Sequence, residues 1–459
     1  MMKPSLAHAA SGRQSMFSIP DCSSTHATHG ARACAALVTD GATTGGAVRS
    51  GLAAPASAPA SIVPDDAPAV RLLAETLREA ARRNASDLHV EPLEHGWRIR
   101  LRIDGVLHES ARPPAHLRDA FVTRIKVLAR MDIAERRIPQ DGRLRLSPRG
   151  ETQAHEDYRV NSLPTLHGEK LVLRRLEALP ADLSLAALGL DQTQQQTLGA
   201  AIGAPHGLVL VTGPTGSGKT LSLYCFLQML NNASRNLCSV EDPAEIQLAG
   251  INQVNVREKA GLTFALALRA LLRQDPDVIM IGEIRDEETA SVAVKAAQTG
   301  HLVLSTLHTN DAPAAVARLI DIGVEPYNLA AALRLVTAQR LVRRLCAKCR
   351  VRSEESAAAL SAAGLDNDQG EAPQPSQPFA ARGCEACHGI GYRGRVGIHE
   401  VMPVSTAMRE LIVAQRSAHE IARQARAEGV ATLRDAALAR VRDGTTSLAE
   451  ALCATDAPS

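Results

Sequence analysis

The chain has 459 residues, of which 45% are hydrophobic and 22% charged, a composition typical of a globular protein with two to four domains. The formal net charge of +2 is too balanced for a nucleic-acid binder, so no nucleic-acid partner is expected. Nine cysteines, an odd number, fit a reducing compartment with a metal site better than a disulfide framework. Neither a transmembrane segment nor a secretory signal is visible, and we expect a cytoplasmic protein that contacts the membrane only peripherally.

The N-terminal part of the chain divides into a tail and a small domain. Residues 1–66 are rich in small residues and proline without any period, which predicts a disordered tail. Residues 67–180 show a helical pattern followed by short alternating strands, and we predict a small α+β domain. Along one of these strands Arg98, Arg100 and Arg102 alternate with apolar residues, as in a half-buried strand.

The remainder of the chain is predicted to form three further regions. Apolar strands alternate with helices over residues 181–345, which predicts an α/β core with a mainly parallel sheet. A cysteine-rich module is expected over residues 346–400. The last region, 401–459, is Ala-rich and amphipathic, and we expect it to be helical.

A phosphate-binding loop follows the first apolar strand of this core and precedes a helix, which is the context that the motif G-x-x-x-x-G-K-T requires. The loop consists of Gly213, Pro214, Thr215, Gly216, Ser217, Gly218, Lys219 and Thr220. Its glycines let backbone N–H groups face phosphate oxygens, and the new helix directs its positive end at the same charge. Lys219 is expected to reach the β- and γ-phosphates and Thr220 to bind Mg²⁺, so ATP and Mg²⁺ are the expected cofactors. The alternative is a glycine-rich turn without a ligand.

Carboxylates and a histidine follow other strands of the predicted core. Glu283 comes after the apolar strand 278–281, and it is our main candidate for holding the Mg²⁺ shell or positioning water. Glu241, Asp242 and His308 also follow predicted strands, and ligands bind at the carboxyl ends of strands in open α/β sheets. A structural role for His308 is the alternative reading.

Two arginines four residues apart, Arg269 and Arg273, would share one face of a predicted helix. They are candidates for contact with phosphate or with a neighbouring subunit. A solvated basic stripe explains them equally well.

Two C-x-x-C pairs, Cys346 with Cys349 and Cys384 with Cys387, can supply four thiolates to one tetrahedral Zn²⁺. Their separation is longer than in common zinc fingers, but a folded module tolerates a long loop. Three alternatives are c-type haem attachment, because His388 completes C-x-x-C-H, a redox pair, and four free thiols.

Several motifs in this order resemble the secretion ATPases of type II secretion and type IV pilus assembly, the GspE/PilB family. The resemblance rests on the P-loop and on the segments 240–243, 272–280, 282–286 and 299–311, with 86–91 and 102–105 in the N-terminal domain. It covers about residues 67–450.

The resemblance implies a RecA-like P-loop NTPase core and a PAS-like N-terminal α+β domain. It also implies a homohexamer that binds ATP between these two domains and works on an inner-membrane platform protein. By the same resemblance, Lys219 and Thr220 are expected to be the Walker A pair, and Glu283 the Walker B carboxylate. The remaining candidates are Glu241 and Asp242 in an Asp box, His301 and His308 in a His box, and Arg102 and Arg124 approaching the nucleotide. The four cysteines are similar to those of the assembly branch of the family.

The sequence departs from the family pattern at two main places. Longer members carry a further N-terminal domain that docks on a membrane-bound partner, where this chain has only the tail. His108 stands where an arginine is often found. The expected function is a cytoplasmic motor for pilus or pseudopilus assembly; a DNA-uptake pseudopilus ATPase, a RecA-like DNA translocase or helicase, and a non-hydrolysing regulator are the alternatives.

Overall fold

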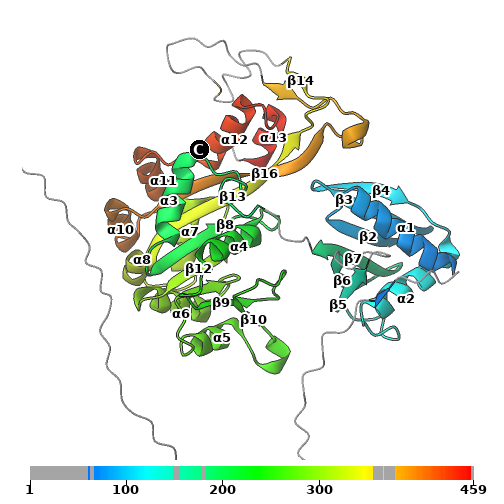
Figure 1. The fold of residues 1–459 in the computed structure, drawn as a ribbon, viewed down its shortest axis with the longest axis horizontal. Coiled ribbons are helices and arrows are strands. Elements are labelled where there is room, and N and C mark those ends of the chain that lie inside the picture. Colours follow the sequence, from blue (N-terminus) through cyan, green and yellow to red (C-terminus); the bar gives the residue numbers. More distant parts are fainter. Residues whose placement is uncertain are drawn as a thin grey trace, which may run out of the picture. The chain divides into compact units, whose positions relative to one another are not determined.

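The computed structural model describes residues 60–61, 67–147, 156–176, 182–354, 365 and 378–455. The predicted disordered tail therefore lies outside the described residues, apart from the short strand β1 (Ala60–Ser61). Over the described ranges the chain forms two seven-stranded sheets and a two-stranded sheet (Figure 1). Among the helices of these ranges, none combines the length and the apolar character needed to cross a membrane.

The first sheet has the strand order β1-β5-β6-β7-β2-β3-β4 and is antiparallel apart from the β1–β5 pair. Its other strands are β2 (Asp87–Leu93), β3 (Gly96–Ile103), β4 (Val106–Ala111), β5 (Gln140–Ser147), β6 (Glu156–Thr165) and β7 (Gly168–Leu176). Helices α1 (Pro68–Arg82) and α2 (Arg118–Leu128), with the 3-10 turn η1 (Ala115–Leu117), accompany it. Apolar residues of both helices share one core with one face of the sheet.

The period-two pattern of the sequence explains which face of this sheet is buried. Along β3 every second residue, including Ile99 and Leu101, is buried, while the arginines between them are partly exposed. Asp104 and Gly105, both with positive φ (46° and 85°), form the turn between β3 and β4, as a two-residue hairpin requires. The predicted half-buried strand is confirmed.

The second sheet, β10-β9-β11-β12-β8-β13-β16, is parallel except for the antiparallel β13–β16 pair. Its strands are β8 (Gly207–Thr212), β9 (Leu237–Glu241), β10 (Asn252–Asn255), β11 (Val278–Ile281), β12 (Leu302–Leu307), β13 (Leu333–Leu345) and β16 (Tyr392–Pro403). All residues of β8, β9, β11 and β12 are buried, as expected for parallel strands covered on both faces. The predicted α/β core is confirmed.

Helices cover both faces of this sheet, so that alternate residues of β8 enter different cores. Leu208 and Leu210 pack with helices α5 to α8, whereas Val209 and Val211 pack with α3 and α4. The helices are α3 (Gln192–Ile202), α4 (Lys219–Leu230), α5 (Phe264–Leu271), α6 (Glu287–Gln298), α7 (Ala312–Asp321) and α8 (Pro326–Ala332), with η2 (Glu258–Ala260) before α5.

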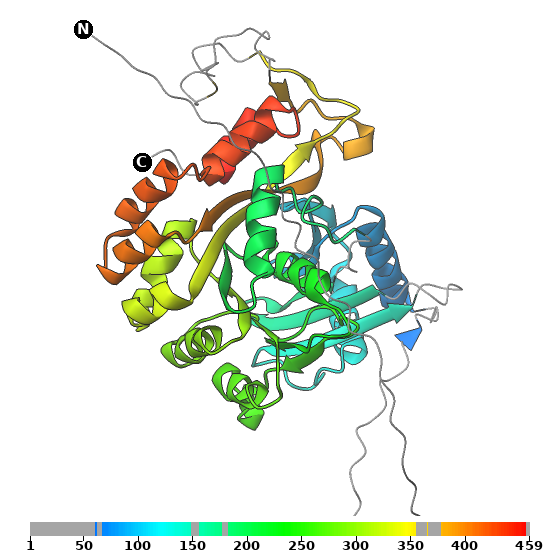
Figure 2. The same ribbon diagram turned by 60° about the vertical axis from the view of Figure 1, so that its left-hand side comes forward.

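The C-terminal region is helical, as predicted, and consists of α10 (Thr406–Val413), α11 (Ala418–Ala427), α12 (Leu433–Arg442) and α13 (Leu448–Ala454). Helices α12 and α13, coloured red in Figure 2, pack along the long strands β13 and β16. A partly buried ion pair between Arg343 and Glu450 (Nη2–Oε2 2.5 Å) connects β13 to α13. The two-stranded sheet of β14 (Val351–Arg352) and β15 (Phe379–Ala380), with η3 (Glu385–Cys387), belongs to the cysteine module between β13 and β16.

Candidate active site and metal centre

The P-loop leaves the carboxyl end of β8, which lies between β12 and β13 in the sheet. Gly213, Gly216 and Gly218 all have positive φ (147°, 82° and 88°), a conformation that favours glycine. Helix α4 begins at Lys219 without a side chain capping its first N–H groups, which leaves them available to an anion. The geometry is that of a phosphate site.

The Lys219 ammonium is buried and turned into the loop. Its Nζ donates to the backbone carbonyls of Gly213 (2.8 Å) and Pro214 (3.1 Å). Burial lowers the pKa of Lys219, and the nearby Glu283 carboxylate opposes this shift. Lys219 and Glu283 are therefore electrostatic neighbours in one site.

Glu283 lies in the loop after β11, next to the carboxyl end of β12. Its Oε2 is 3.2 Å from Nε2 of His308, and its Oε1 accepts a hydrogen bond from Arg285. Burial raises the pKa of Glu283, but the hydrogen bonds from Arg285 and His308 outweigh this effect and hold the pKa below its usual value. Glu283 is thus ionised at neutral pH and prepared to hold a cation or orient water.

The two predicted His-box histidines lie at opposite ends of β12. His308 follows the strand and reaches Glu283, whereas His301 precedes the strand and its Nδ1 lies 3.0 Å from the carbonyl of Ala296. Within this chain only His308 joins the site around the P-loop.

Glu241 and Asp242 have different environments, although they are adjacent. The buried Glu241 carboxylate accepts from Tyr224 Oη (2.5 Å), Ser239 Oγ (2.5 Å) and Gln253 Nε2 (3.0 Å). Asp242 is exposed, and its charge contributes to raising the pKa of Arg285. The charge of Asp242 therefore acts on Arg285, the partner of Glu283, while the Glu241 carboxylate lies in the core.

The expectation that Arg269 and Arg273 share a helix face is wrong, because α5 ends at Leu271. The chain turns out of the helix there, with a positive φ (51°) at Asp275 before Pro276. Arg269 pairs with Glu288 of α6 (2.7 Å), and Arg273 Nη1 donates to the carbonyl of Arg269 (3.0 Å).

The arginines of the N-terminal sheet already have acidic partners. Glu91 accepts from Arg98 (2.9 Å) and Arg100 (2.7 Å) and lies 3.1 Å from the Lys170 ammonium, and Arg102 lies 3.7 Å from Asp87. Burial raises the pKa of Glu91, but these hydrogen bonds lower it to about 2. The buried Nε of Arg124 has no hydrogen-bond partner among the described residues.

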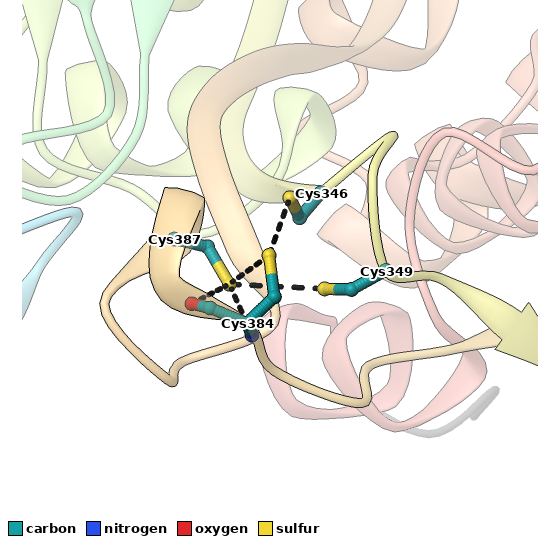
Figure 3. Close-up of side chains that lie close together, drawn as sticks. All are labelled: Cys346, Cys349, Cys384 and Cys387. Atoms are coloured by element: carbon teal, nitrogen blue, oxygen red, sulfur yellow. Dashed lines mark hydrogen bonds between the residues drawn. The ribbon is translucent and has the colours of Figure 1, made fainter.

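The four predicted metal ligands form one cluster, and their sulfur atoms all lie within 4.8 Å of one another. Figure 3 shows the Sγ atoms converging: Cys346 lies 3.9 Å from Cys384, and Cys387 lies 3.7 Å from both Cys349 and Cys384. Four sulfurs bound tetrahedrally to Zn²⁺ at about 2.3 Å would be about 3.8 Å apart. The backbone N–H groups of Cys384 (3.1 Å) and Gly391 (3.2 Å) donate to Cys387 Sγ, which favours a thiolate.

Sequence reasoning missed the polar contacts that hold the P-loop from behind. Gln339 of β13 donates from Nε2 to the Ser217 carbonyl (2.8 Å), and Thr212 contacts Thr309. The strand that carries Gln339 also contains Thr337 and several arginines, so its sequence did not single out Gln339. Arg285, the strongest partner of Glu283, was also not singled out.

A P-loop at the carboxyl end of a parallel sheet, with an ionised carboxylate after β11, two strands away from β8, defines the class of P-loop nucleoside triphosphatases. The chain matches the family described as Type II/IV secretion system protein over residues 63–453. It belongs to that family and is an ATPase.

Two curated relatives illustrate the similarity. The type IV pilus assembly ATPase PilB of Myxococcus xanthus (strain DK1622) is 49% identical over 84% of this chain and 68% of its own length. The type II secretion system protein E of Pseudomonas aeruginosa is 48% identical over 84% of this chain and 76% of its own length.

Solved structures share the fold. The pilus retraction motor PilT with bound ADP matches with a TM-score of 0.56 at 26% identity, over 84% of this chain and 97% of that chain. The Legionella pneumophila ATPase DotB matches with a TM-score of 0.60 at 21% identity, over 83% of this chain and 94% of that chain.

Proposed function

We propose that this chain is the motor subunit that hydrolyses ATP to drive assembly of a type IV pilus fibre or of the pseudopilus of type II secretion. The observation that carries the proposal is the P-loop lysine beside the Glu283–His308 pair, in a chain whose relatives are named as ATPases of these two machines.

In this function Lys219 exchanges its two carbonyl partners in the loop for oxygens of the β- and γ-phosphates. The exchange is favourable because a buried ammonium with a lowered pKa gains an anionic partner. The Thr220 hydroxyl, at the second residue of α4, would be the protein ligand to the Mg²⁺ that accompanies ATP.

Glu283 acts as an ionised group that orients the attacking water or the metal shell. Its lowered pKa makes it a weak proton acceptor, so orientation is the larger part of its role. His308 and Arg285 hold its two oxygens, and the charge of Asp242 helps to raise the pKa of Arg285. Arg269 and Arg273 are proposed to act between subunits, because within the core they bind Glu288 and a backbone carbonyl instead of joining the site. The N-terminal arginines are proposed to approach the nucleotide.

The assembly we propose is a homohexamer on the cytoplasmic side of the inner membrane, in contact with a membrane platform protein. A P-loop site needs positive charge on the γ-phosphate side, and an arginine from another domain or subunit often supplies it. The cysteine cluster is proposed to hold one structural Zn²⁺ per chain. We also propose that the chain divides into a tail, an N-terminal domain, an ATPase core, a cysteine module and a C-terminal helical region, with boundaries at residues 66, 180, 345 and 400.

The test combines turnover with fibre formation. A strain that lacks the gene should lose pili or type II secretion, wild-type protein should restore them, and Lys219→Ala protein should not. Purified protein should hydrolyse ATP as a ring, with or without residues 2–60. If DNA stimulates hydrolysis and the deletion strain still assembles fibres and secretes, the protein is a DNA translocase instead.

A further inference from the structure

Gln339 is a buried amide directly behind the P-loop. It belongs to β13, which pairs in parallel with β8, and it follows Ala338, the partner of the last β8 residue, Thr212. Its side chain is 2% exposed. An amide in such a place is unfavourable unless its polar atoms are hydrogen-bonded, so its bonds identify its role.

Both polar atoms of the Gln339 amide are used, and their orientation is determined. The Ser217 carbonyl can only accept, so the atom 2.8 Å from it must be the donor Nε2. Oε1 then accepts from the Ser222 hydroxyl at 2.7 Å. Ser222 lies in the first turn of α4, so one side chain binds both the loop and the helix that follows it.

The same residue limits the space behind two P-loop glycines. A Cβ atom at Gly213 would lie 2.4 Å from the backbone oxygen of Gln339, and one at Gly218 would lie 2.9 Å from its Nε2. Both glycines also have positive φ. The loop is therefore closely fitted against β13, and its backbone has little freedom to shift towards that strand.

The hydrogen bond to Ser217 has a consequence for the phosphate side of the loop. In a trans peptide the C=O of one residue and the N–H of the next point in opposite directions. Because Gln339 holds the Ser217 carbonyl towards β13, the Gly218 N–H is directed away from β13, into the loop where phosphate binds.

We propose that Gln339 is a positioning residue of the nucleotide site, whose amide fixes the Ser217–Gly218 peptide so that the Gly218 N–H meets phosphate. Gln339 does not contact the nucleotide itself. This inference rests on nucleotide binding at the P-loop and is independent of the machine that the motor drives.

The first test is Gln339→Leu, which keeps the bulk of the side chain and removes both hydrogen bonds. The dissociation constant for ADP should rise about tenfold or more, since one directed hydrogen bond to a charged phosphate is lost. KM for ATP should rise more than kcat falls. Thr337→Val is the matched control. Thr337 is buried two residues earlier on the same face of β13, and its hydroxyl has no hydrogen-bond partner among the described residues. The Thr337→Val protein should bind ADP as the wild-type protein does.

The second test is Gln339→Glu, which retains the acceptor for Ser222 and replaces the donor. A protonated carboxyl group can donate to the Ser217 carbonyl and an ionised one cannot, so ADP affinity should recover towards the wild-type value as the pH falls. Wild-type protein and Thr337→Val should not show this recovery.

A purely structural role for Gln339 gives different results. In that case Gln339→Leu would lower the unfolding temperature but leave the ADP dissociation constant of the folded protein at the wild-type value, and Gln339→Glu would show no recovery at low pH. Either result overturns the proposal. If wild-type protein does not bind ADP at all, the assignment of the nucleotide site itself is wrong. A fibre-assembly phenotype tests the proposed machine and does not test the role of Gln339.

Discussion

The hydroxyl groups of Thr212 and Thr309 lie 2.6 Å apart and join the strand that leads into the P-loop to the residue that follows His308. The Thr309 N–H also donates to the Thr212 hydroxyl at 2.9 Å. Because His308 contacts Glu283, this junction links the phosphate loop to the carboxylate that we propose for catalysis.

We predict that Thr309→Val lowers kcat by about 5- to 30-fold, with little change in ADP affinity. This factor corresponds to an activation free energy raised by roughly 1–2 kcal/mol, because His308 and Glu283 are less well oriented. Steady-state turnover and equilibrium binding measure the two quantities. Thr212→Val should have a similar effect, and the double variant should lose no more than either single one, because both changes remove the same contact. Fully multiplicative losses in the double variant would argue against a shared junction.

Lys219 and Glu283 should differ in which step they support. Lys219→Ala is expected to reduce nucleotide binding strongly, because the loop loses its only ammonium for phosphate. Glu283→Gln should retain binding and lower kcat by about 100-fold or more, because a neutral amide replaces the charge that orients water or metal. Binding and turnover assays on each variant decide the question; near-normal turnover in Glu283→Gln would transfer the role to Asp242 or Glu241.

The cysteine cluster should hold about one Zn²⁺ per chain. Metal analysis of purified protein measures this content, and Cys384→Ser should lower it and destabilise the cysteine module before the P-loop core, because binding energy there is folding energy. Cys453→Ser is the control, since Cys453 is exposed and outside the cluster. Wild-type protein without zinc, or full zinc content in Cys384→Ser, would contradict this assignment.

Glu400 should make stability depend on pH. This residue is buried on β16, and burial raises its pKa from 4.5 to about 7. The charge of Asp311 adds to the shift, whereas the N–H of Ala312 and the charge of Arg426 oppose it. The folded protein favours the protonated form of Glu400. The stabilisation that this group contributes is therefore fully present below pH 4.5 and is lost as the pH rises through 7.

Glu400→Gln should therefore raise the free energy of unfolding by about 2–3 kcal/mol at pH 8 and leave it nearly unchanged at pH 4.5. Denaturant unfolding at the two pH values measures the difference. Glu410→Gln, at an exposed position of α10, should change neither value. An equal effect of Glu400→Gln at both pH values would show that packing, not protonation, dominates.

The sequence predicted the parts of the site that are contiguous in the chain. The P-loop is recognisable because strand, glycines, lysine and helix follow one another within thirteen residues, 207–219, and their conformations depend on local sterics. The C-x-x-C pairs are recognisable because each pair needs only a short turn to direct two thiols to one point, and the structure brings all four together.

The direction of a side chain at a strand end could not be predicted in this way. Glu241 and Asp242 looked equivalent, but only Glu241 faces the helix that carries Tyr224, so its carboxylate enters the core. His301 and His308 belong to one motif, yet β12 separates them along its full length, because a strand places its two ends at opposite edges of the sheet.

By itself the sequence determined the family, the parallel core, the phosphate loop and the four cysteines, because these depend on local order and periodicity. Only the tertiary structure decided what holds the loop: Gln339 lies on β13 and Thr309 follows β12, the strands on either side of β8, and both are far from the P-loop in the chain. A buried polar side chain acquires its role from the hydrogen-bond partner that packing brings to it, and the order of strands in the sheet sets that partner.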